Sequence, residues 1–532
     1  GTTTAPDFQP RDSIVYDSTP LTEQSPFTGL KLNLISLDDN DAPSTVGPKI
    51  DITIASAVPV SQYYDELNIT LTKTLLSQAI LLSGTPGGDG SAVFLRIQPL
   101  GIRDIALNYI TTELSVLLTE VPDTVPPYLV SADVQYSKGI LHIVLDEYVG
   151  YNVSAGNDPE FAMVNLSAIF LADYSGARHV PLVGAYIQPE VNTSIYITLT
   201  EEQRVDAIEF SGTPGGDGKS VYLDILAGGL TDLAGNEILA TLNVSVGEEA
   251  DVLVPIILSG TIDYSTGLLS ITAQETIDAT SIDTSKMFIS DVAGQKNIQL
   301  IGTSLTIVED STTVTIQISE AMRALAISIS GLDGGNLHND GNLYPVVLDF
   351  EANALTDIAQ SGNLGQDGVL VSEVADIIKP HVVSGSIDYN NGYLRIETSE
   401  TVDVTDPYNG TNVLNLGLIQ LVNAPTWDVA TNTYAVDNYM SLDGANIIEL
   451  DGTTITIELT EAQRATAVFF SNTPGGGGTG VSGDGEAIHL TVLPGAIRDV
   501  ANNTNNVTFN NESITETADT TQPQLIAQSI HY

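Results

Sequence analysis

The sequence contains no cysteine and few basic residues, with 17 lysines and arginines against 67 acidic residues in a chain of 532. Without cysteine there is no disulfide framework and no thiolate chemistry. The formal net charge of −50 excludes nucleic acid as a partner, since phosphate binding needs clustered lysine and arginine. The same charge disfavours an anionic membrane surface. No apolar run reaches the roughly 18 residues of a membrane-spanning helix, so we expect no membrane insertion.

The residues that are abundant favour a folded β protein. Hydrophobic residues make up 42% of the chain and charged residues only 16%, which is ample for packed cores. Valine, isoleucine, leucine, threonine and tyrosine are plentiful, and this mixture favours strands over helices. The acidic surface fits mutual repulsion in solution, cation binding or adaptation to high salt.

A segment of fourteen residues recurs four times without a gap. Each copy begins with aspartate, has proline at the fifth position followed by an apolar pair, and ends with tyrosine. The copies are DTVPPYLVSADVQY (123–136), DVLVPIILSGTIDY (251–264), DIIKPHVVSGSIDY (376–389) and DTTQPQLIAQSIHY (519–532). The proline stops any preceding element and starts an extended strand. After three copies a glycine follows (Gly139, Gly267, Gly392), and an alternating second strand is predicted at 140–149, 268–277 and 393–402.

A second block also recurs four times. A hydroxyl residue stands where a helix N-cap would lie, at Thr72, Thr200, Ser319 and Thr460. Gln203 and Gln463 stand three residues later in two copies, as in a capping box. The block predicts a single helical turn and then a strand. Glycine-rich turns follow at 84–90, 212–218, 331–336 and 473–478, and then aspartates that we expect to cap turns, at Asp104, Asp232, Asp357 and Asp499.

Short strands separated by regular turn signals predict an all-β fold of tandem Ig-like β-sandwich domains in a linear array, with a C-terminal orphan strand. The spacing of the junction aspartates divides the chain into five parts. Repeat one covers 1–122, repeat two 123–250, repeat three 251–375, repeat four 376–518, and the tail 519–532.

The repeats resemble a known family. TDLAGN at 231–236 and DGTT at 451–454 are its clearest motifs here. They resemble the Ig-like repeats of bacterial and protist extracellular proteins, including subunits of glycosylated extracellular filaments. The resemblance implies an extracellular or cell-surface location. It leaves function open, because such modules serve adhesins, surface layers, enzyme spacers and filaments alike.

The tail carries the pattern of a first strand, with Pro523, Leu525, Ile526, Ile530 and Tyr532 at the repeat's proline, apolar and tyrosine positions. In one register, residues 13–17 align with the second strand of the other repeats, and the residues before them make a poor first strand. Repeat one would then lack its first strand. The tail of one subunit would supply it to the next by donor-strand complementation.

A competing register aligns residues 13–16 with the end of a first strand and Pro6 with the repeat's proline. Repeat one would then be complete, and the tail would begin a fifth repeat of a longer array. A frayed end without a role is a third possibility.

Metal and catalytic signals are weak. No paired-acid, zinc-protease or nucleophile-elbow motif stands out and the six histidines lack ligand spacing, so we expect no enzyme and no catalytic residue. Calcium is the plausible metal, because carboxylates on glycine-rich turns and at junctions suit a hard cation. The candidates are Asp89 and Asp217 in the turns and Asp123, Asp251 and Asp376 at the junctions. Ordinary turn formation is the alternative reading of these aspartates.

Nine N-x-S/T sequons are candidate N-glycosylation sites. They are Asn68, Asn152, Asn165, Asn192, Asn243, Asn409, Asn502, Asn506 and Asn511. The first hypothesis is therefore a glycosylated structural subunit of an extracellular filament that self-assembles head to tail. The alternatives are a spacer or stalk fragment of a longer adhesin or surface-layer protein, and an enzyme on an Ig-like scaffold.

Overall fold

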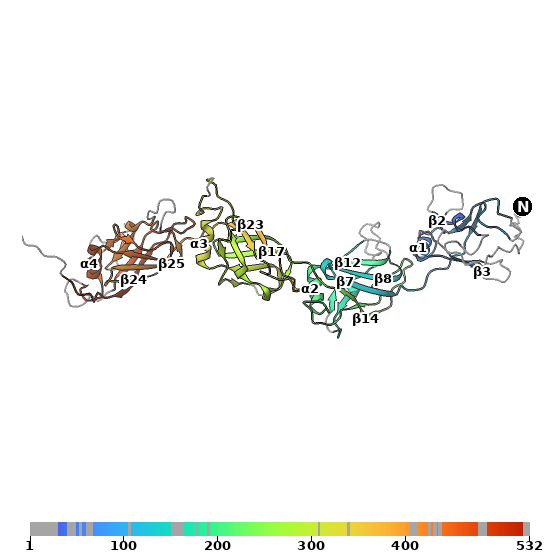
Figure 1. The fold of residues 1–532 in the computed structure, drawn as a ribbon, viewed down its shortest axis with the longest axis horizontal. Coiled ribbons are helices and arrows are strands. Elements are labelled where there is room, and N and C mark those ends of the chain that lie inside the picture. The colour runs from blue at the N-terminus through green and yellow to red at the C-terminus, as the bar shows by residue number, and fades with distance from the viewer. Residues whose placement is uncertain are drawn as a thin grey trace, which may run out of the picture. The chain divides into compact units, whose positions relative to one another are not determined.

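The computed structural model describes residues 30–39, 49–52, 56–59, 67–104, 108–149, 164–176, 179–188, 192–306, 309–337, 341–404, 413–423, 427–428, 433–434, 439–476 and 487–524. The chain forms two compact units, 1–253 and 254–532. The first unit contains repeats one and two and residues 251–253, and the second contains the rest of repeat three, repeat four and the tail. Figure 1 colours the chain from repeat one in blue to repeat four in red.

The helices and strands of the first unit fall into two sets. Those of repeat one are β1 (Ile35–Asp38), β2 (Lys49–Asp51), β3 (Ser56–Pro59), β4 (Leu67–Thr70), α1 (Lys73–Leu81), β5 (Phe94–Ile97) and β6 (Leu114–Leu117). Those of repeat two are β7 (Leu129–Gln135), β8 (Ile140–Val149), β9 (Ile169–Ala172), β10 (His179–Pro181), β11 (Tyr186–Ile187), β12 (Asn192–Thr198), α2 (Glu201–Glu209), β13 (Tyr222–Ile225), β14 (Thr241–Ser245) and β15 (Gly247–Glu249).

The second unit follows the same order. Repeat three contains β16 (Ile257–Asp263), β17 (Leu268–Ile277), β18 (Met287–Ser290), β19 (Ile298–Gln299), β20 (Ser304–Leu305), β21 (Ser311–Gln317), α3 (Glu320–Ser328), β22 (Val347–Phe350) and β23 (Gln366–Val374). Repeat four contains β24 (Val382–Asp388), β25 (Tyr393–Val402), β26 (Ile419–Val422), β27 (Trp427–Asp428), β28 (Thr433–Tyr434), β29 (Tyr439–Ser441), β30 (Asn446–Ile447), β31 (Gly452–Glu458), α4 (Glu461–Phe470), β32 (His489–Val492), β33 (Phe509–Ser513) and β34 (Thr515–Thr517).

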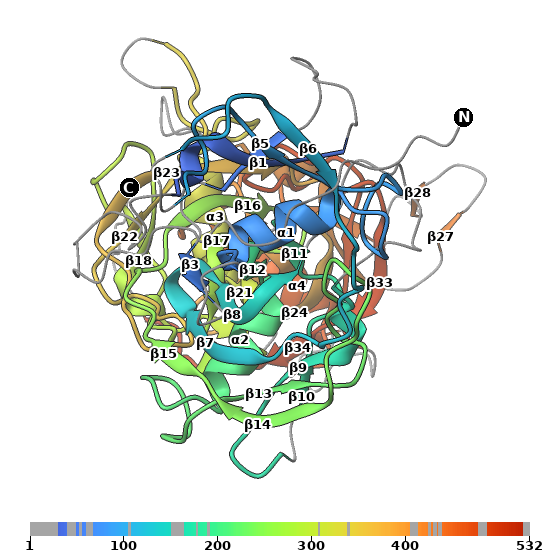
Figure 2. The ribbon, with the colours of Figure 1, turned by 90° about the vertical axis from the view of Figure 1, so that its right-hand side faces the viewer.

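Repeat two shows the architecture. One sheet has the order β11-β12-β8-β7-β15 and the other β10-β9-β13-β14, and in Figure 2 strands β10, β13 and β14 lie apart from β7, β8 and β12. This is the two-sheet arrangement of an immunoglobulin-like sandwich. Repeat four has the same two sheets. In repeat three β23 pairs with both β22 and β16, which joins the layers into one eight-stranded sheet. The chain is an all-β array of Ig-like repeats, as the sequence predicts.

The predicted first and second strands are confirmed. Each first strand (β7, β16, β24) begins two residues after the repeat's proline, and each second strand (β8, β17, β25) has the predicted bounds. The glycine between them adopts the left-handed conformation, with φ of 62° at Gly139, 68° at Gly267 and 72° at Gly392. A side chain would be strained there, which accounts for glycine at this point of the hairpin.

The prediction of a single helical turn followed by a strand is wrong in length. The four helices run for nine or ten residues and include the apolar residues that the sequence assigned to the strand. In α2 these residues, Ala207 and Ile208, are buried on the helix face against the core. The four predicted N-caps and both capping boxes, at Thr200 and Thr460, are confirmed. In the part of the chain described here, no helix has the length and apolar character that crossing a membrane requires.

Repeat one is described in part. Its sheet β2-β1-β5-β6 corresponds to β10-β9-β13-β14 of repeat two. Its strand before the helix, β4, pairs with β3, whereas the equivalent β12, β21 and β31 also pair with the second strand of their repeats. The residues on which the two competing registers depend lie in 1–29, outside the described residues.

Candidate functional site

The first strand of repeats two, three and four is followed directly by a buried tyrosine, whose hydroxyl donates to a glutamate of the last strand of the same repeat. The hydroxyl-to-carboxylate distances are 2.9 Å for Tyr136–Glu248, 2.7 Å for Tyr264–Glu373 and 2.7 Å for Tyr389–Glu516. Burial, together with the neighbouring carboxylate, raises the pKa of each tyrosine far above its ordinary value. Each hydroxyl therefore stays protonated and donates to the glutamate.

The turn that follows the helix holds each of these glutamates in place. Backbone N–H groups donate to the carboxylates from Gly212 at 3.3 Å, Gly331 at 3.0 Å and Asn472 at 3.2 Å. The turn, the last strand and the first strand therefore meet at one polar point inside an apolar sandwich. Because an unpaired buried polar group is costly, this arrangement fixes the register of the first strand.

The first strand presents a fixed set of positions to the core, and a shift of pairing register between positions seven and nine changes which parity faces inward. Counting the junction aspartate as position one, the side chains at positions seven, twelve and fourteen of repeats three and four are buried, namely Ile257, Ile262, Tyr264, Val382, Ile387 and Tyr389. Position eight faces outward, with Val130, Leu258 and Val383 exposed by 55%, 56% and 60%. Position ten must be small in repeat three, since a Cβ on Gly260 would lie 2.7 Å from the Leu348 side chain.

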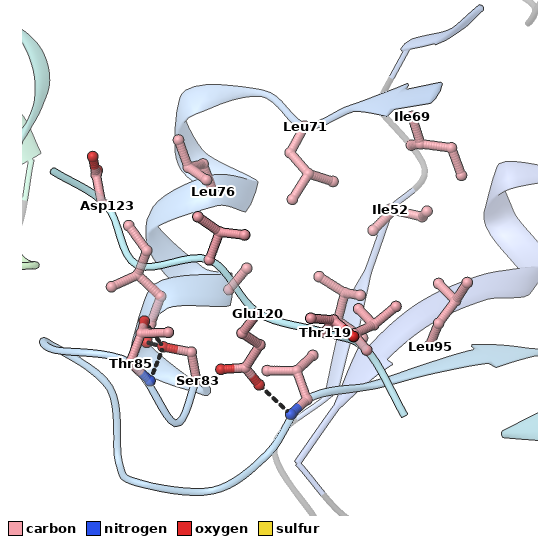
Figure 3. A pocket seen from close by; sticks show the side chains of 16 residues that line it. Ile52, Ile69, Leu71, Leu76, Ser83, Thr85, Leu95, Thr119, Glu120 and Asp123 are labelled. Carbon is pink, nitrogen blue, oxygen red and sulfur yellow. Dashed lines mark hydrogen bonds between the residues drawn. The ribbon is translucent and has the colours of Figure 1, made fainter. Parts of the chain in front are cut away.

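Repeat one carries the same acceptor geometry. Glu120 accepts N–H groups from Gly84 at 2.8 Å and Val93 at 2.6 Å, which are the bonds made by its equivalent Glu248. No tyrosine of the described residues donates to Glu120. Instead the carboxylate lies beside a pocket of about 540 Å³. Figure 3 shows Glu120 among the apolar side chains that line the pocket.

The lining of this pocket corresponds to the surface that the first strand covers elsewhere. Leu95 and Leu118 line it. The residues equivalent to them lie beside the position-ten glycines of the later repeats. Leu348 and Val371 lie 2.7 and 3.4 Å from a Cβ built on Gly260, and Leu490 and Ile514 lie 3.0 and 2.8 Å from one built on Gly385. The pocket therefore stands where positions ten to fourteen of a first strand would pack.

The junction aspartate that opens the fourteen-residue segment is bonded to an arginine of the preceding helix at three of the four junctions. Arg204 bonds Asp251 at 2.5 Å, Arg323 bonds Asp376, and Arg464 bonds Asp519 at 2.7 Å. Asn390 also accepts the N–H of Thr520 at 2.8 Å. The start of the tail thus leaves repeat four through the contacts that hold the other junctions. In α1 of repeat one, Leu76 stands in place of the arginine.

The structure describes the tail as far as Gln524. Pro523 is exposed, while Leu525, Ile526, Ile530 and Tyr532 lie outside the described residues. The positions equivalent to Leu525, Ile530 and Tyr532 are the inward ones, and those equivalent to Ile526 are more than half exposed. Equivalence with the complete repeats therefore assigns three inward positions to the tail, Leu525, Ile530 and Tyr532, and leaves Ile526 facing outward.

Carboxylates gather at one end of repeats two and four. Asp123, Glu147 and Asp232 form one group, and Asp376, Glu400 and Asp499 another, with candidate ligand oxygens within 4.8 Å of one another in each. Burial and neighbouring carboxylates raise the pKa of Glu147 to about 7 and of Glu400 to about 7. Burial likewise raises the pKa of Asp499 to about 6. These sites favour a cation or a proton.

The sequence predicted two of these six residues as metal ligands, Asp123 and Asp376. Asp232 and Asp499 do cap turns as expected, accepting N–H groups from Asn236 at 2.8 Å and Asn503 at 2.7 Å, but they also join the groups. The glutamates were missed. The available signal was the inward parity of the second strand, since Glu147 shares a face with the buried Leu145 and Val149.

Three calcium candidates remain, Asp251, Asp89 and Asp217. Asp251 is buried against Arg204. Asp89 and Asp217 are exposed in the glycine turns and accept N–H groups from Ser91 at 2.8 Å and Lys219 at 2.9 Å. Among the described residues neither belongs to a group of three close acids, which agrees with the turn-forming alternative.

Five of the candidate glycosylation sites have described, exposed side chains, namely Asn68, Asn165, Asn243, Asn502 and Asn506. Asn192 lies at the start of β12 and Asn511 in β33. Asn152 and Asn409 lie outside the described residues. Each of the five is accessible to a modifying enzyme, as glycan attachment requires.

No protein-family model and no curated protein matches this chain. Solved structures give weak likenesses. Domains A168–A170 of titin are 8% identical, cover 74% of this chain and 99% of theirs, and have a TM-score of 0.18. Extracellular domains 3–5 of Drosophila OTK are 10% identical, cover 75% of this chain and 100% of theirs, and have a TM-score of 0.18. Domains 1–6 of the surface layer protein SbsC are 10% identical, cover 74% of this chain and 55% of theirs, and have a TM-score of 0.16. Likeness at this level says nothing about what the chain does.

Proposed function

We propose that this chain is a structural subunit of an extracellular filament, in which residues 519–532 of one copy complete repeat one of the next copy. Glu120 is the observation that carries the proposal. It has the backbone bonds of the three glutamates that hold a first-strand tyrosine, and it lies at a pocket with the matching lining. The tail supplies the matching tyrosine, Tyr532.

The proposed joint follows the register of the complete repeats. The first strand pairs in parallel with the last strand, with Gly247 beside Asp133, Ser372 beside Thr261 and Thr515 beside Ser386. By equivalence Thr119 of repeat one pairs with Ser529 of the tail. Strand addition of this kind gives main-chain hydrogen bonds for affinity and side-chain pockets for register. Leu525, Ile530 and Tyr532 each add roughly 1.5–3 kcal/mol when fully buried.

A head-to-tail contact between different surfaces does not close on itself, so it extends into a filament. Copies that repel one another through a net charge of −50 are kept from other, nonspecific contacts. The family resemblance and the exposed sequons support an extracellular, glycosylated assembly. The role is structural rather than catalytic.

The absence of native cysteine makes the joint directly testable. The double variant Thr119→Cys with Ser529→Cys places two thiols at paired positions. Oxidation of the assembled full-length chain should give a ladder of disulfide-linked oligomers on a denaturing gel. Pairing Thr119→Cys with Ala527→Cys shifts the second thiol out of register and is the matched control, which should crosslink much less.

Electron microscopy of the same samples, beside a chain truncated after residue 518, completes the test. Filaments from the full chain and monomers from the truncation support the joint. Monomeric full-length chains without a ladder would reject it and favour the spacer or stalk alternative, in which residues 6–16 of the same chain fill the pocket.

A further inference from the structure

One buried glutamate of repeat two, Glu147, has a carboxylate oxygen that no described residue bonds. Glu147 is 8% exposed, and its Oε1 atom is buried without a hydrogen-bond partner. It is carried by β8 on the face that packs into the core. A carboxylate in this position is costly unless a cation or a proton neutralises it.

Glu147 is aimed at two further carboxylates. Asp123 comes from the junction segment and Asp232 from the loop after β13, and the candidate ligand oxygens of the three lie within 4.8 Å of one another. The basic side chain that acts on Glu147, Lys73, pairs with the neighbouring Asp146 at 3.9 Å and is 55% exposed. Three converging acids with so weak a counter-charge leave a strongly negative point in the fold.

We propose that Asp123, Glu147 and Asp232 bind a calcium ion at the junction of repeats one and two. All the side-chain donors are oxygen, which excludes a preference for soft metals. Calcium is bound by about 6–8 oxygens in adaptable geometry, and three carboxylates with water and nearby carbonyls can supply them. Magnesium demands stricter octahedral geometry and keeps more of its water, so it fits less well.

The group in repeat four has the same members but a different environment. Arg323 donates to Asp376 and, at 3.0 Å, to Glu400, so a guanidinium already neutralises two of the three acids. Oε1 of Glu400 remains buried without a partner. The Asp376, Glu400 and Asp499 group is therefore the weaker calcium site of the two.

The ion would connect the segments that form the junction. The turn of repeat one at Gly87 approaches the Asp232 loop so closely that a Cβ would lie 1.9 Å from the Leu233 carbonyl oxygen. Beside Glu147, the Tyr148 hydroxyl bonds Thr74 of α1 at 2.8 Å. Holding Asp123, β8 and this loop together fixes the surface on which repeat one rests.

Calorimetric titration of calcium chloride into the chelator-treated full chain tests the proposal. The wild type should bind at the Asp123 group, and Glu147→Gln should weaken this binding at least about tenfold, since a full ligand charge is lost. Asp217→Asn, at an exposed turn position, should leave binding unchanged. Magnesium chloride should bind more weakly than calcium.

Thermal melting of the same proteins guards against misfolding. In chelator Glu147→Gln should melt at or above the wild-type temperature, because it removes an uncompensated buried charge. In calcium the order should reverse. The proposal is overturned if the wild-type protein shows neither heat of calcium binding nor a calcium-dependent change in melting temperature. It is also overturned if Glu147→Gln melts below the wild type by the same margin with and without calcium.

Discussion

Repeats one and three follow one plan but differ at the first-strand position. In repeat three Ile262 and Tyr264 are buried in the core, and the tyrosine hydroxyl donates to Glu373. In the described part of repeat one, Glu120 is the counterpart of Glu373, and it lies beside a pocket. Among the described residues, the Gly84 and Val93 amides position the acceptor Glu120 without a tyrosine, so on the proposed function the groove is formed before a strand enters it. Such preorganisation lowers the entropic cost of binding.

The two helices differ as well. Arg323 of α3 is buried and bonds Asp376, Glu400, Glu320 and the Tyr264 carbonyl. Leu76 of α1 stands at the same position of repeat one and lines the pocket. Repeat three therefore meets its neighbour through a buried ionic network, whereas the junction of repeats one and two lacks the guanidinium and gathers its acids around Glu147.

The largest expected effect comes from the tyrosines. Tyr264→Ala should destabilise repeat three by about 3–5 kcal/mol, since it removes a buried ring and leaves Glu373 without its donor. Tyr532→Ala should leave each repeat of the free chain unchanged and prevent assembly. Hydrogen exchange resolved by peptide measures the first effect and microscopy the second. Equal loss of protection in both variants would mean that the tail belongs to the fold of its own chain.

The arginine gives the next effect. Arg323→Leu copies the residue of repeat one and leaves Asp376 and Glu400 buried without their cation, which should cost about 3 kcal/mol. The reverse change, Leu76→Arg, should alter stability little. Trp427 is the one tryptophan and lies in repeat four, so its fluorescence during urea unfolding reports the first change. An unchanged midpoint would show that solvent replaces the guanidinium.

The junction of repeats three and four should also weaken in acid. Burial alone would raise the pKa of Glu320, but bonds from the Arg323 guanidinium and the Thr401 N–H lower it. A lowered pKa gives stability that is present above the unfolded value of about 4.3 and is lost as the pH falls through the folded value. Glu320→Gln should remove about 1 kcal/mol at pH 6 and little at pH 3. Equal urea midpoints for variant and wild type at both values would contradict this.

The smallest effect separates the helix caps. Thr200 accepts the Gln203 N–H at 3.2 Å and belongs to a full capping box. Thr72 accepts the Leu75 N–H at 3.3 Å, but Leu75 has no polar side chain that could accept the Thr72 N–H and complete a capping box. Thr200→Ala should cost about 1 kcal/mol and Thr72→Ala less. Urea unfolding followed by circular dichroism gives both values, and a larger loss at Thr72 would contradict the assignment.

The sequence predicts the strands well because their patterns are local. The alternation in 140–149 places Leu141, Ile143 and Leu145 on one face, and the structure has β8 with those bounds. The helices were misjudged in length because a short apolar run fits either element. Burial of Ala207 on a helix face depends on how α2 packs, which its own residues do not encode.

The carboxylate groups were predicted only in part, for a different reason. Asp123 and Asp232 are far apart in sequence and meet only when the junction and the loop after β13 close on β8. Asp232 carries a turn-capping pattern that explains it fully without a metal. Glu147, read alone, is an acid near the end of a strand. Only its place in the alternation of β8, on the same face as Leu145 and Val149, distinguishes it from a solvent-exposed acid.

The parallel pairing of first and last strands has a mechanical consequence. In repeats two, three and four the chain enters along one of these strands and leaves along the other, and the two run in the same direction side by side. Tension applied through the ends of a repeat therefore shears the pair, so its backbone bonds carry load together instead of parting one after another. Repeat three pairs four residues in this way and repeats two and four pair three each, so repeats two and four should yield first under a pulling force.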